Sequence, residues 1–199
     1  MWNTKSVVID DFLEKEHFDF LTKVDFGEMK PKDWKNYANS VQNGKLVKLA
    51  GEIPADMLLD MDKKYTPKLL KVLDDLVPGL SKQYKHTEIT LTAIGKDLVF
   101  HVHTDKLEKI LSVVVYIYPE QNAGTLLYNS KIDSKNGTDE QEVEWKQNRA
   151  FIFSRTDTSW HNYKADGKNP RVVLVYNLRN DNAKNNLKEA EAGKSTFYD

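Results

Sequence analysis

The sequence predicts one mainly β domain with flanking α-helices, and three observations support this prediction. The chain has 199 residues, a length that suits a single domain with a sizeable core. From residue 87 onward it consists of short runs rich in Val, Ile, Thr and aromatic residues, with turn residues between them. No helical pattern separates these runs, as the connections of a parallel βαβ sheet would require. We therefore expect residues 87–180 to form a β-sandwich or β-barrel core.

Short strands are expected throughout this core. Their ranges are 88–94, 98–103, 110–118, 124–128, 143–145, 149–153, 160–163 and 171–178. Turn residues such as Asn136-Gly137 and Asp166-Gly167 separate them. The polar segment 181–199 has no apolar face, so we expect it to be a tail outside the core.

Residues 1–86 are expected to form a helical and irregular N-terminal support for the core. The apolar run 7–9 predicts a short strand, and Asp10 or Asp11 can cap the helix that follows it. Apolar residues then recur at helical spacing as far as Val24, which gives this helix one apolar face.

A second helix is predicted to begin near Thr66-Pro67, because Thr is a favourable N-cap and Pro suits the first helical position. Its apolar stripe consists of Leu69, Leu70, Leu73, Leu76 and Val77. Pro78-Gly79 is expected to end it.

Between these helices, residues 27–50 show weak periodicity and are expected to be irregular, with a strand only near 46–49. Trp34 and Tyr37 lie in this segment. Because lids over binding sites are often loops, these aromatic residues suggest a lid.

Composition argues against several classes of protein. Lys plus Arg number 29 and Asp plus Glu number 30, so the net charge of -1 gives no electrostatic reason to expect nucleic-acid binding. The absence of cysteine excludes disulfides, thiolate metal sites and cysteine nucleophiles. The first residues lack the apolar stretch of a secretory signal, and no apolar run reaches membrane-spanning length. We expect a cytoplasmic protein without a membrane partner.

Three residues are candidate metal ligands. His103 and Asp105 lie two residues apart at a predicted strand end, where period-2 geometry puts both on one face. His161 follows a later β run and can supply a third ligand from a distant strand. Two histidines and one carboxylate are the ligands of non-haem iron(II) oxygenases, and they leave other coordination positions open. A His-x-Asp pair alone arises easily by chance, and a surface His and Asp at a strand end is the alternative.

Arg171 lies ten residues after His161, at the start of an apolar run that extends to residue 176. An arginine fixed at a strand start can bind a carboxylate through two parallel hydrogen bonds. A solvated or surface-paired arginine is the alternative. The spacing from His161 favours a role for Arg171 in the same site.

In their order, these pieces resemble the iron(II)/2-oxoglutarate oxygenases, in particular the prolyl 4-hydroxylase-like branch. The matching pieces are His103-Thr104-Asp105, the strand 110–118, Asn122-Ala123-Gly124-Thr125-Leu126 in place of that branch's Gly-Gly-x-Thr turn, the strand 148–153, His161 and Arg171. The resemblance covers roughly half of the chain, and its specificity rests on the ordered set of motifs.

The resemblance implies a double-stranded β-helix core of the jelly-roll or cupin-like kind. It also implies a hydroxylase in which His103, Asp105 and His161 hold iron(II). The co-substrate 2-oxoglutarate would chelate the metal and pair its 5-carboxylate with Arg171, and dioxygen would be the oxidant. The implied substrate is a prolyl or other amino-acid side chain in a peptide, with a free small molecule or a nucleobase as the alternatives.

The chain departs from the family pattern at two places. Ala123 stands where a glycine is usual, and Thr92 lies on the strand where the branch often has a tyrosine that reaches the co-substrate. The hydroxyl role would then fall to Thr92 or to Tyr116. A β-forming threonine and a core tyrosine are the alternatives for these two residues.

Three more residues are candidates for the pocket lining. His101 shares the predicted strand face of His103, and Trp160 and Tyr163 flank His161. Either aromatic residue suits a place in the core, at the rim or against the substrate. His17 and His86 are expected to be structural or at the surface.

Two other functions fit part of the pattern. One is a β-sandwich binding module, lectin-like or cupin-like, in which the His and Asp residues are structural or hold a different metal. The other is a hydrolase or isomerase with a cupin-type metal site that does not use 2-oxoglutarate. Neither function gives Arg171 a role, so this residue distinguishes them from an oxygenase.

Overall fold

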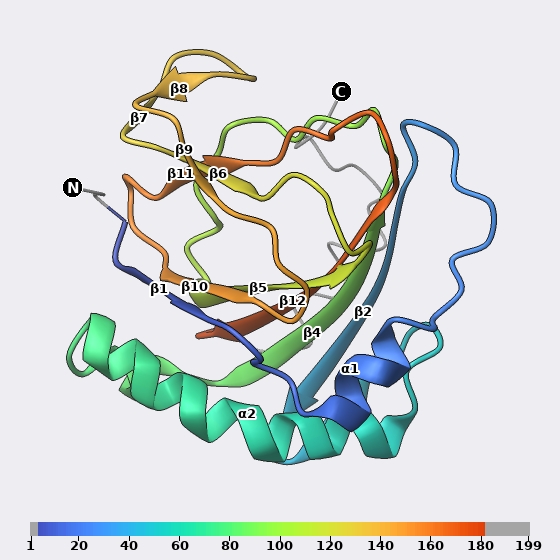
Figure 1. The fold of residues 1–199 in the computed structure, drawn as a ribbon. Coiled ribbons are helices and arrows are strands. Elements are labelled where there is room, and N and C mark those ends of the chain that lie inside the picture. Colours follow the sequence, from blue (N-terminus) through green and yellow to red (C-terminus); the bar gives the residue numbers. More distant parts are fainter. Residues whose placement is uncertain (1–3, 182–199) are drawn as a thin grey trace.

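The computed structural model describes residues 4–181, and within them a large sheet and a small sheet face each other above two helices (Figure 1). The helices are α1 (Lys15–Leu21) and α2 (Ala55–Leu76), with a 3-10 turn at Leu80–Gln83. The strands are β1 (Ser6–Ile9), β2 (Trp34–Gln42), β3 (Lys45–Lys48), β4 (His86–Ile94), β5 (Lys109–Tyr118), β6 (Thr125–Tyr128), β7 (Ser130–Lys131), β8 (Gly137–Thr138), β9 (Gln141–Val143), β10 (Ala150–Ser154), β11 (Trp160–Asn162) and β12 (Arg171–Arg179). The predicted mainly β fold with flanking helices is confirmed, and the predicted tail 182–199 lies outside the described residues.

The large sheet has seven antiparallel strands in the order β1-β10-β5-β12-β4-β2-β3, and the small sheet has the order β11-β6-β9. Strands far apart in the sequence are therefore neighbours, with the C-terminal strand β12 between β5 and β4. This non-sequential antiparallel order is typical of jelly-roll architectures.

The two faces of the large sheet have different surroundings, because successive side chains of a strand point to opposite faces. On β4 and β12, Ile89, Leu91, Leu174 and Tyr176 pack into the apolar core shared with the helices. The intervening residues face the small sheet. Their rows across the strands are Trp34–Ile94–Arg171, Asn36–Thr92–Val173–Tyr116, Ala38–Thr90–Val175–Val114 and Glu88–Asn177–Ser112. Apart from Tyr116, the residues of these rows line one wall of the cavity described below.

Helix α2 begins at Ala55, eleven residues earlier than predicted, and contains Pro67. Thr66 is therefore inside the helix. Its hydroxyl donates a hydrogen bond to the Asp62 carboxylate and forms another with the Tyr176 hydroxyl. The helix continues through the proline because its buried stripe extends in both directions. Leu58, Met61, Tyr65, Leu69 and Leu73 are all buried at helical spacing.

Residues 27–50 contain a regular strand, contrary to the irregular segment that was predicted. Strand β2 pairs with β4 along eight residues, so Trp34 and Tyr37 belong to the sheet and not to a loop over the site. Trp34 lines the cavity, whereas Tyr37 points to the opposite face and stacks on Phe26 at 5.0 Å. Trp34 and Tyr37 therefore do not belong to a loop that could act as a lid.

Two smaller predictions are also corrected. Residues 98–103 form no strand and make isolated bridges instead, Val99 to Lys164 and His103 to His161. Helix α1 begins after Glu14 without a side-chain cap, so neither Asp10 nor Asp11 caps it, and Asp10 pairs with Arg149 at 2.7 Å. The strand predicted at 7–9 is confirmed as β1.

Gly124 occupies a position where a side chain has no space. A Cβ atom there would lie 1.8 Å from the carbonyl oxygen of Val143 on the neighbouring strand β9. We expect Gly124→Ala to lower the free energy of unfolding by about 2 kcal/mol or more, because the two strands must separate. Urea unfolding measures this change. Ala123→Gly, one residue away, is the control and should cost less than about 1 kcal/mol; equal costs would contradict the close contact.

No helix among residues 4–181 has both the length and the apolar character needed to cross a membrane.

Candidate metal centre and anion pocket

His103, Asp105 and His161 come together between the two sheets. Each offers one ligand atom, and these atoms all lie within 4.8 Å of one another. The backbones of His103 and His161 exchange two hydrogen bonds, of 3.0 and 2.9 Å, which fix the two imidazoles side by side. Asp105 lies two residues after the bridging residue His103, and its side chain is almost fully buried. The sequence predicted these three residues as one site, and the geometry brings them together.

Both imidazoles have the tautomer that a metal ligand needs. Nδ1 of His103 lies 2.7 Å from the carbonyl oxygen of His101, and Nδ1 of His161 lies 2.9 Å from that of Ser159. A carbonyl only accepts, so each Nδ1 carries the proton and each Nε2 keeps its lone pair. Burial is the largest cause that lowers the pKa of His103 to about 3, and the neighbouring His161 is the second. This imidazole is therefore neutral at pH 7.

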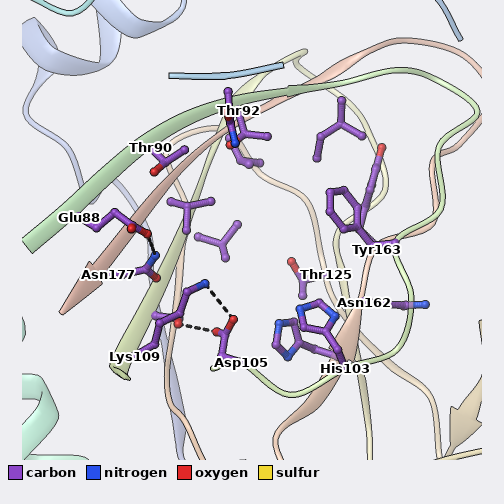
Figure 2. A pocket seen from close by; sticks show the side chains of 18 of the residues that line it. Glu88, Thr90, Thr92, His103, Asp105, Lys109, Thr125, Asn162, Tyr163 and Asn177 are labelled. Atoms are coloured by element: carbon purple, nitrogen blue, oxygen red, sulfur yellow. Dashed lines mark hydrogen bonds and ion pairs between the residues drawn. The ribbon is translucent and has the colours of Figure 1, made fainter. Parts of the chain in front are cut away.

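The Asp105 carboxylate is held by two side chains. Lys109 Nζ lies 2.9 Å from Oδ1, and the Ser112 hydroxyl donates to Oδ2 at 2.6 Å. Burial alone would raise the pKa of Asp105, but Lys109 and the two histidines outweigh it and hold the pKa below its ordinary value. The carboxylate is therefore ionised and oriented (Figure 2).

This donor set fits iron(II). Two imidazole nitrogens and one carboxylate oxygen on one side of an ion are the facial arrangement of non-haem iron oxygenases. Three protein ligands leave positions open for a co-substrate and dioxygen. Each ligand also has the hydrogen-bonded support that fixes its orientation.

We expect Ser112→Ala to weaken metal binding by about tenfold to hundredfold, since partners that orient a ligand typically contribute this much. Isothermal titration with Mn(II) as an iron(II) substitute measures the change. Ser154→Ala is the matched control: this buried serine bonds to the backbone of Ile110 and does not line the cavity. Equal metal affinity of Ser112→Ala and the wild type would contradict the role of Ser112.

Arg171 is the most unusual charged residue of the cavity. Its side chain is almost fully buried, and no carboxylate among residues 4–181 forms an ion pair with it. Within residues 4–181 its guanidinium donates long hydrogen bonds, 3.4 Å to the Gly124 carbonyl and 3.5 Å to the Thr125 hydroxyl, it also interacts with the Tyr163 side chain, and its Nε has no acceptor. Burial lowers the pKa of Arg171. A buried cation without a partner is costly, so the site is suited to an anionic ligand.

Aromatic rings surround this guanidinium and hold it in place. It lies over the rings of Tyr163 at 4.0 Å, Tyr116 at 5.2 Å and Trp145 at 5.3 Å. The Tyr116 hydroxyl donates to Thr125 and accepts from the Thr125 backbone amide, both at 3.0 Å. A planar cation fixed between rings presents its N–H groups in one direction, which suits a carboxylate.

A single cavity of about 330 Å³ joins the three metal ligands and Arg171. Its middle is lined by apolar side chains, including Val114, Phe153, Val173 and Val175. Figure 2 shows Tyr163 on one side of the metal ligands and Glu88 with Asn177 on the other. The metal ligands therefore lie between two polar ends.

The remaining predicted residues occupy different places. Thr92 and Tyr163 line the cavity. Tyr116 lies directly behind, in contact with Arg171 and Thr125. His101 and Trp160 are not among the lining residues, and His101 contributes its backbone carbonyl to His103.

Sequence reasoning missed several polar residues of the cavity, including Glu88, Lys109, Ser112 and Asn177. The sequence did contain a signal for Asn177, which is a polar residue in an apolar strand. Because alternate residues of a strand share a face, it lies on the same face as Arg171, Val173 and Val175. No comparable pattern points to Lys109 or Ser112, because their relation to Asp105 depends on how the chain turns into β5.

No family model matches the sequence, and no curated protein matches it either. Solved structures with a similar fold do exist. A prolyl-4-hydroxylase from Pseudomonas putida is 13% identical with a TM-score of 0.57, and the match covers 90% of this chain and 95% of that one. An oxidoreductase of the 2-oxoglutarate/iron(II) oxygenase family from Burkholderia pseudomallei is 14% identical with a TM-score of 0.60, covering 89% and 85%.

A third similar structure is a Trichoplax adhaerens prolyl hydroxylase in complex with a peptide fragment of the hypoxia-inducible factor oxygen degradation domain. It is 13% identical with a TM-score of 0.54, and the match covers 97% of this chain and 89% of that one. The three matches span nearly the whole chain, including its N-terminal part. The chain therefore has the double-stranded β-helix fold of the prolyl hydroxylases and 2-oxoglutarate/iron(II) oxygenases, as the sequence resemblance predicted.

Proposed function

We propose that this protein is an iron(II)- and 2-oxoglutarate-dependent dioxygenase that hydroxylates an unactivated C–H bond. One observation carries the proposal: the His103, Asp105 and His161 triad shares a cavity with a buried arginine that has no carboxylate partner among the described residues. A metal site alone suits many enzymes. The combination suits a metal whose co-substrate carries a second, distant carboxylate.

Each part of the cavity has a role in this proposal. His103, Asp105 and His161 hold the metal, and Arg171 binds the 5-carboxylate of 2-oxoglutarate. Bound together, iron(II) and 2-oxoglutarate supply the oxidising chemistry, in which dioxygen gives one oxygen atom to succinate and the other to the substrate, with release of carbon dioxide. The apolar side chains in the middle of the cavity exclude water, and this exclusion strengthens the pairing of Arg171 with a carboxylate.

The proposed substrate is an amino-acid side chain in a peptide, with a prolyl residue as the first choice. Two of the similar structures are prolyl hydroxylases, and the one from Trichoplax adhaerens contains a peptide. Because sequence identity to both is 13%, their fold supports the class of chemistry more strongly than the identity of the oxidised residue.

A non-oxygenase metal-binding module of the cupin-like kind is the competing function. Such a module has no need for a buried, unpaired arginine in the metal cavity, so Arg171 favours the oxygenase.

Succinate formation tests the proposal. The protein is incubated with iron(II), 2-oxoglutarate, oxygen and ascorbate, alone and with panels of peptides, amino acids and nucleobases. We expect succinate in amounts that depend on iron, and stimulation by a member of the peptide panel. A wild-type protein that forms no succinate under any of these conditions would contradict the proposed function.

A further inference from the structure

The cavity is longer than the proposed co-substrate requires. Arg171 and Asn177 both face it from the same strand, six residues apart, which corresponds to roughly 20 Å along β12. In Figure 2, His103 and Asp105 lie between Asn177 and Tyr163, the residue whose ring contacts Arg171. A five-carbon diacid that joins Arg171 to the metal fills only one side, so the side toward Asn177 is available to the molecule that is oxidised.

Asn177 is the central residue of this second end. It is 1% exposed, and its side-chain amide donates to Oε1 of Glu88 at 2.8 Å. Its carbonyl oxygen Oδ1 is buried and has no hydrogen-bond partner among the described residues. Glu88, Asn177 and Ser112 form one row across β4, β12 and β5, and all three line the cavity.

The orientation of the Asn177 amide follows from its neighbour. An ionised Glu88 carboxylate only accepts hydrogen bonds, so the amide nitrogen must face it. The carbonyl oxygen is therefore the atom left over, and a buried carbonyl oxygen without a donor is rare in folded proteins. A ligand that satisfies it must bring an N–H or O–H group.

Two of the cations near this end, Arg179 and Lys109, are already matched to carboxylates. Arg179 lies 3.6 Å from Oε2 of Glu88 and 2.9 Å from Asp181, and Lys109 lies 2.9 Å from Asp105. Lys106 also lines the cavity and is an exposed residue. A ligand carboxylate placed beside Asn177 would meet the Asn177 oxygen and the Glu88 carboxylate, both of which are acceptors.

We propose that Glu88 and Asn177 bind the cationic nitrogen of a basic side chain, the ammonium of lysine or the guanidinium of arginine, in the substrate. Such a group carries several N–H donors and a positive charge. It can satisfy the Asn177 oxygen and lie beside the Glu88 carboxylate at once. This inference rests on the proposed function and adds one feature to its substrate, a basic side chain that is bound beside the oxidised C–H bond.

Binding of matched probes to the loaded protein tests the inference. The protein is loaded anaerobically with iron(II) and 2-oxoglutarate, and loading is checked by the weak visible charge-transfer band. Isothermal titration then uses capped tripeptides whose central residue is lysine or norleucine, and arginine or citrulline. Free lysine and free arginine form separate arms that distinguish a peptide from an amino-acid source.

We expect a basic probe to bind at least about tenfold more tightly than its neutral counterpart, the range for a hydrogen bond to a charged group. Glu88→Gln should remove most of this preference, and Asn177→Leu should weaken basic probes by a similar factor. Glu52→Gln changes an exposed glutamate outside the cavity lining and is the matched control, with the wild-type preference.

Three results would overturn the inference. A wild type that shows the band but binds basic and neutral probes equally, or binds neither, lacks the proposed subsite. A preference that survives in both Glu88→Gln and Asn177→Leu places the subsite elsewhere. A wild type without the band contradicts the proposed function itself, so the two failures are distinguishable.

Discussion

Replacing His103 by alanine is expected to weaken iron(II) binding by more than about hundredfold, because residues that merely orient a ligand already contribute tenfold to hundredfold. The change removes one of three protein ligands and leaves Asp105 and His161 in place. Anaerobic titration with Fe(II), or with Mn(II) as a substitute, measures the dissociation constant. Activity should be lost together with the metal.

His101→Ala is the matched control for this variant. His101 lies two residues away, is absent from the cavity lining, and supports His103 through its backbone carbonyl, which alanine retains. We expect its metal affinity to remain within a few fold of the wild type. A variant His103→Ala that binds metal as well as His101→Ala does would show that the ligands have been misassigned.

Replacing Arg171 by methionine is expected to weaken 2-oxoglutarate binding by at least about thirtyfold while metal affinity changes little. Loss of one partner of a buried charge pair typically costs about 2–5 kcal/mol, and each 1.4 kcal/mol corresponds to a factor of ten. The guanidinium contacts Gly124, Thr125 and aromatic rings but none of the metal ligands. Binding of 2-oxoglutarate to the Mn(II)-loaded protein measures the effect.

Arg149→Met controls for the loss of an arginine. Arg149 pairs with Asp10 outside the cavity, so its removal should leave 2-oxoglutarate binding unchanged. Urea unfolding of both variants separates a binding defect from a folding defect. If Arg171→Met loses metal and 2-oxoglutarate affinity to the same extent, Arg171 supports the fold and is not the anchor of the co-substrate.

The order of motifs in the second half of the chain was sufficient to predict the fold and to select three candidate metal ligands that the structure brings together. The strands there are short, separated by turn residues and rich in β-branched residues, so their positions follow from local sequence. His103 and Asp105 were placed together for a partly incorrect reason: the predicted strand at 98–103 is absent, and the bridge to His161 fixes His103 instead. The triad forms because the two backbones pair, not because of regular strand geometry.

The N-terminal part could not be predicted equally well, because tertiary contacts there outweigh local preference. Strand β2 contains Lys35, Asn36 and Asn39, residues that are uncommon in strands, and it forms because β4 offers a complete edge for pairing. Pro67 suggested a helix start, yet the buried stripe from Leu58 to Leu73 holds one continuous helix through it. In both places packing against the sheet decides the structure.

The polar end of the cavity depends on relations that a single sequence does not display. Glu88 and Asn177 are 89 residues apart and meet only because β12 pairs with β4 in one register. A shift of that register by one residue would turn Asn177 toward the helices. The structure was therefore needed to find the acceptor pair on which the substrate inference rests.

The central claim is that the triad and Arg171 form one iron(II)/2-oxoglutarate centre. Anaerobic titration of the wild-type protein with iron(II) and then 2-oxoglutarate tests this claim most directly, because the complex of both needs the triad and Arg171 in one cavity. The account predicts a weak visible charge-transfer band that appears only when both are present. It also predicts that this band is absent in His103→Ala and requires much more 2-oxoglutarate in Arg171→Met. A wild type without the band, or a band that is unchanged in His103→Ala, would contradict the assignment of this cavity as an iron(II)/2-oxoglutarate centre.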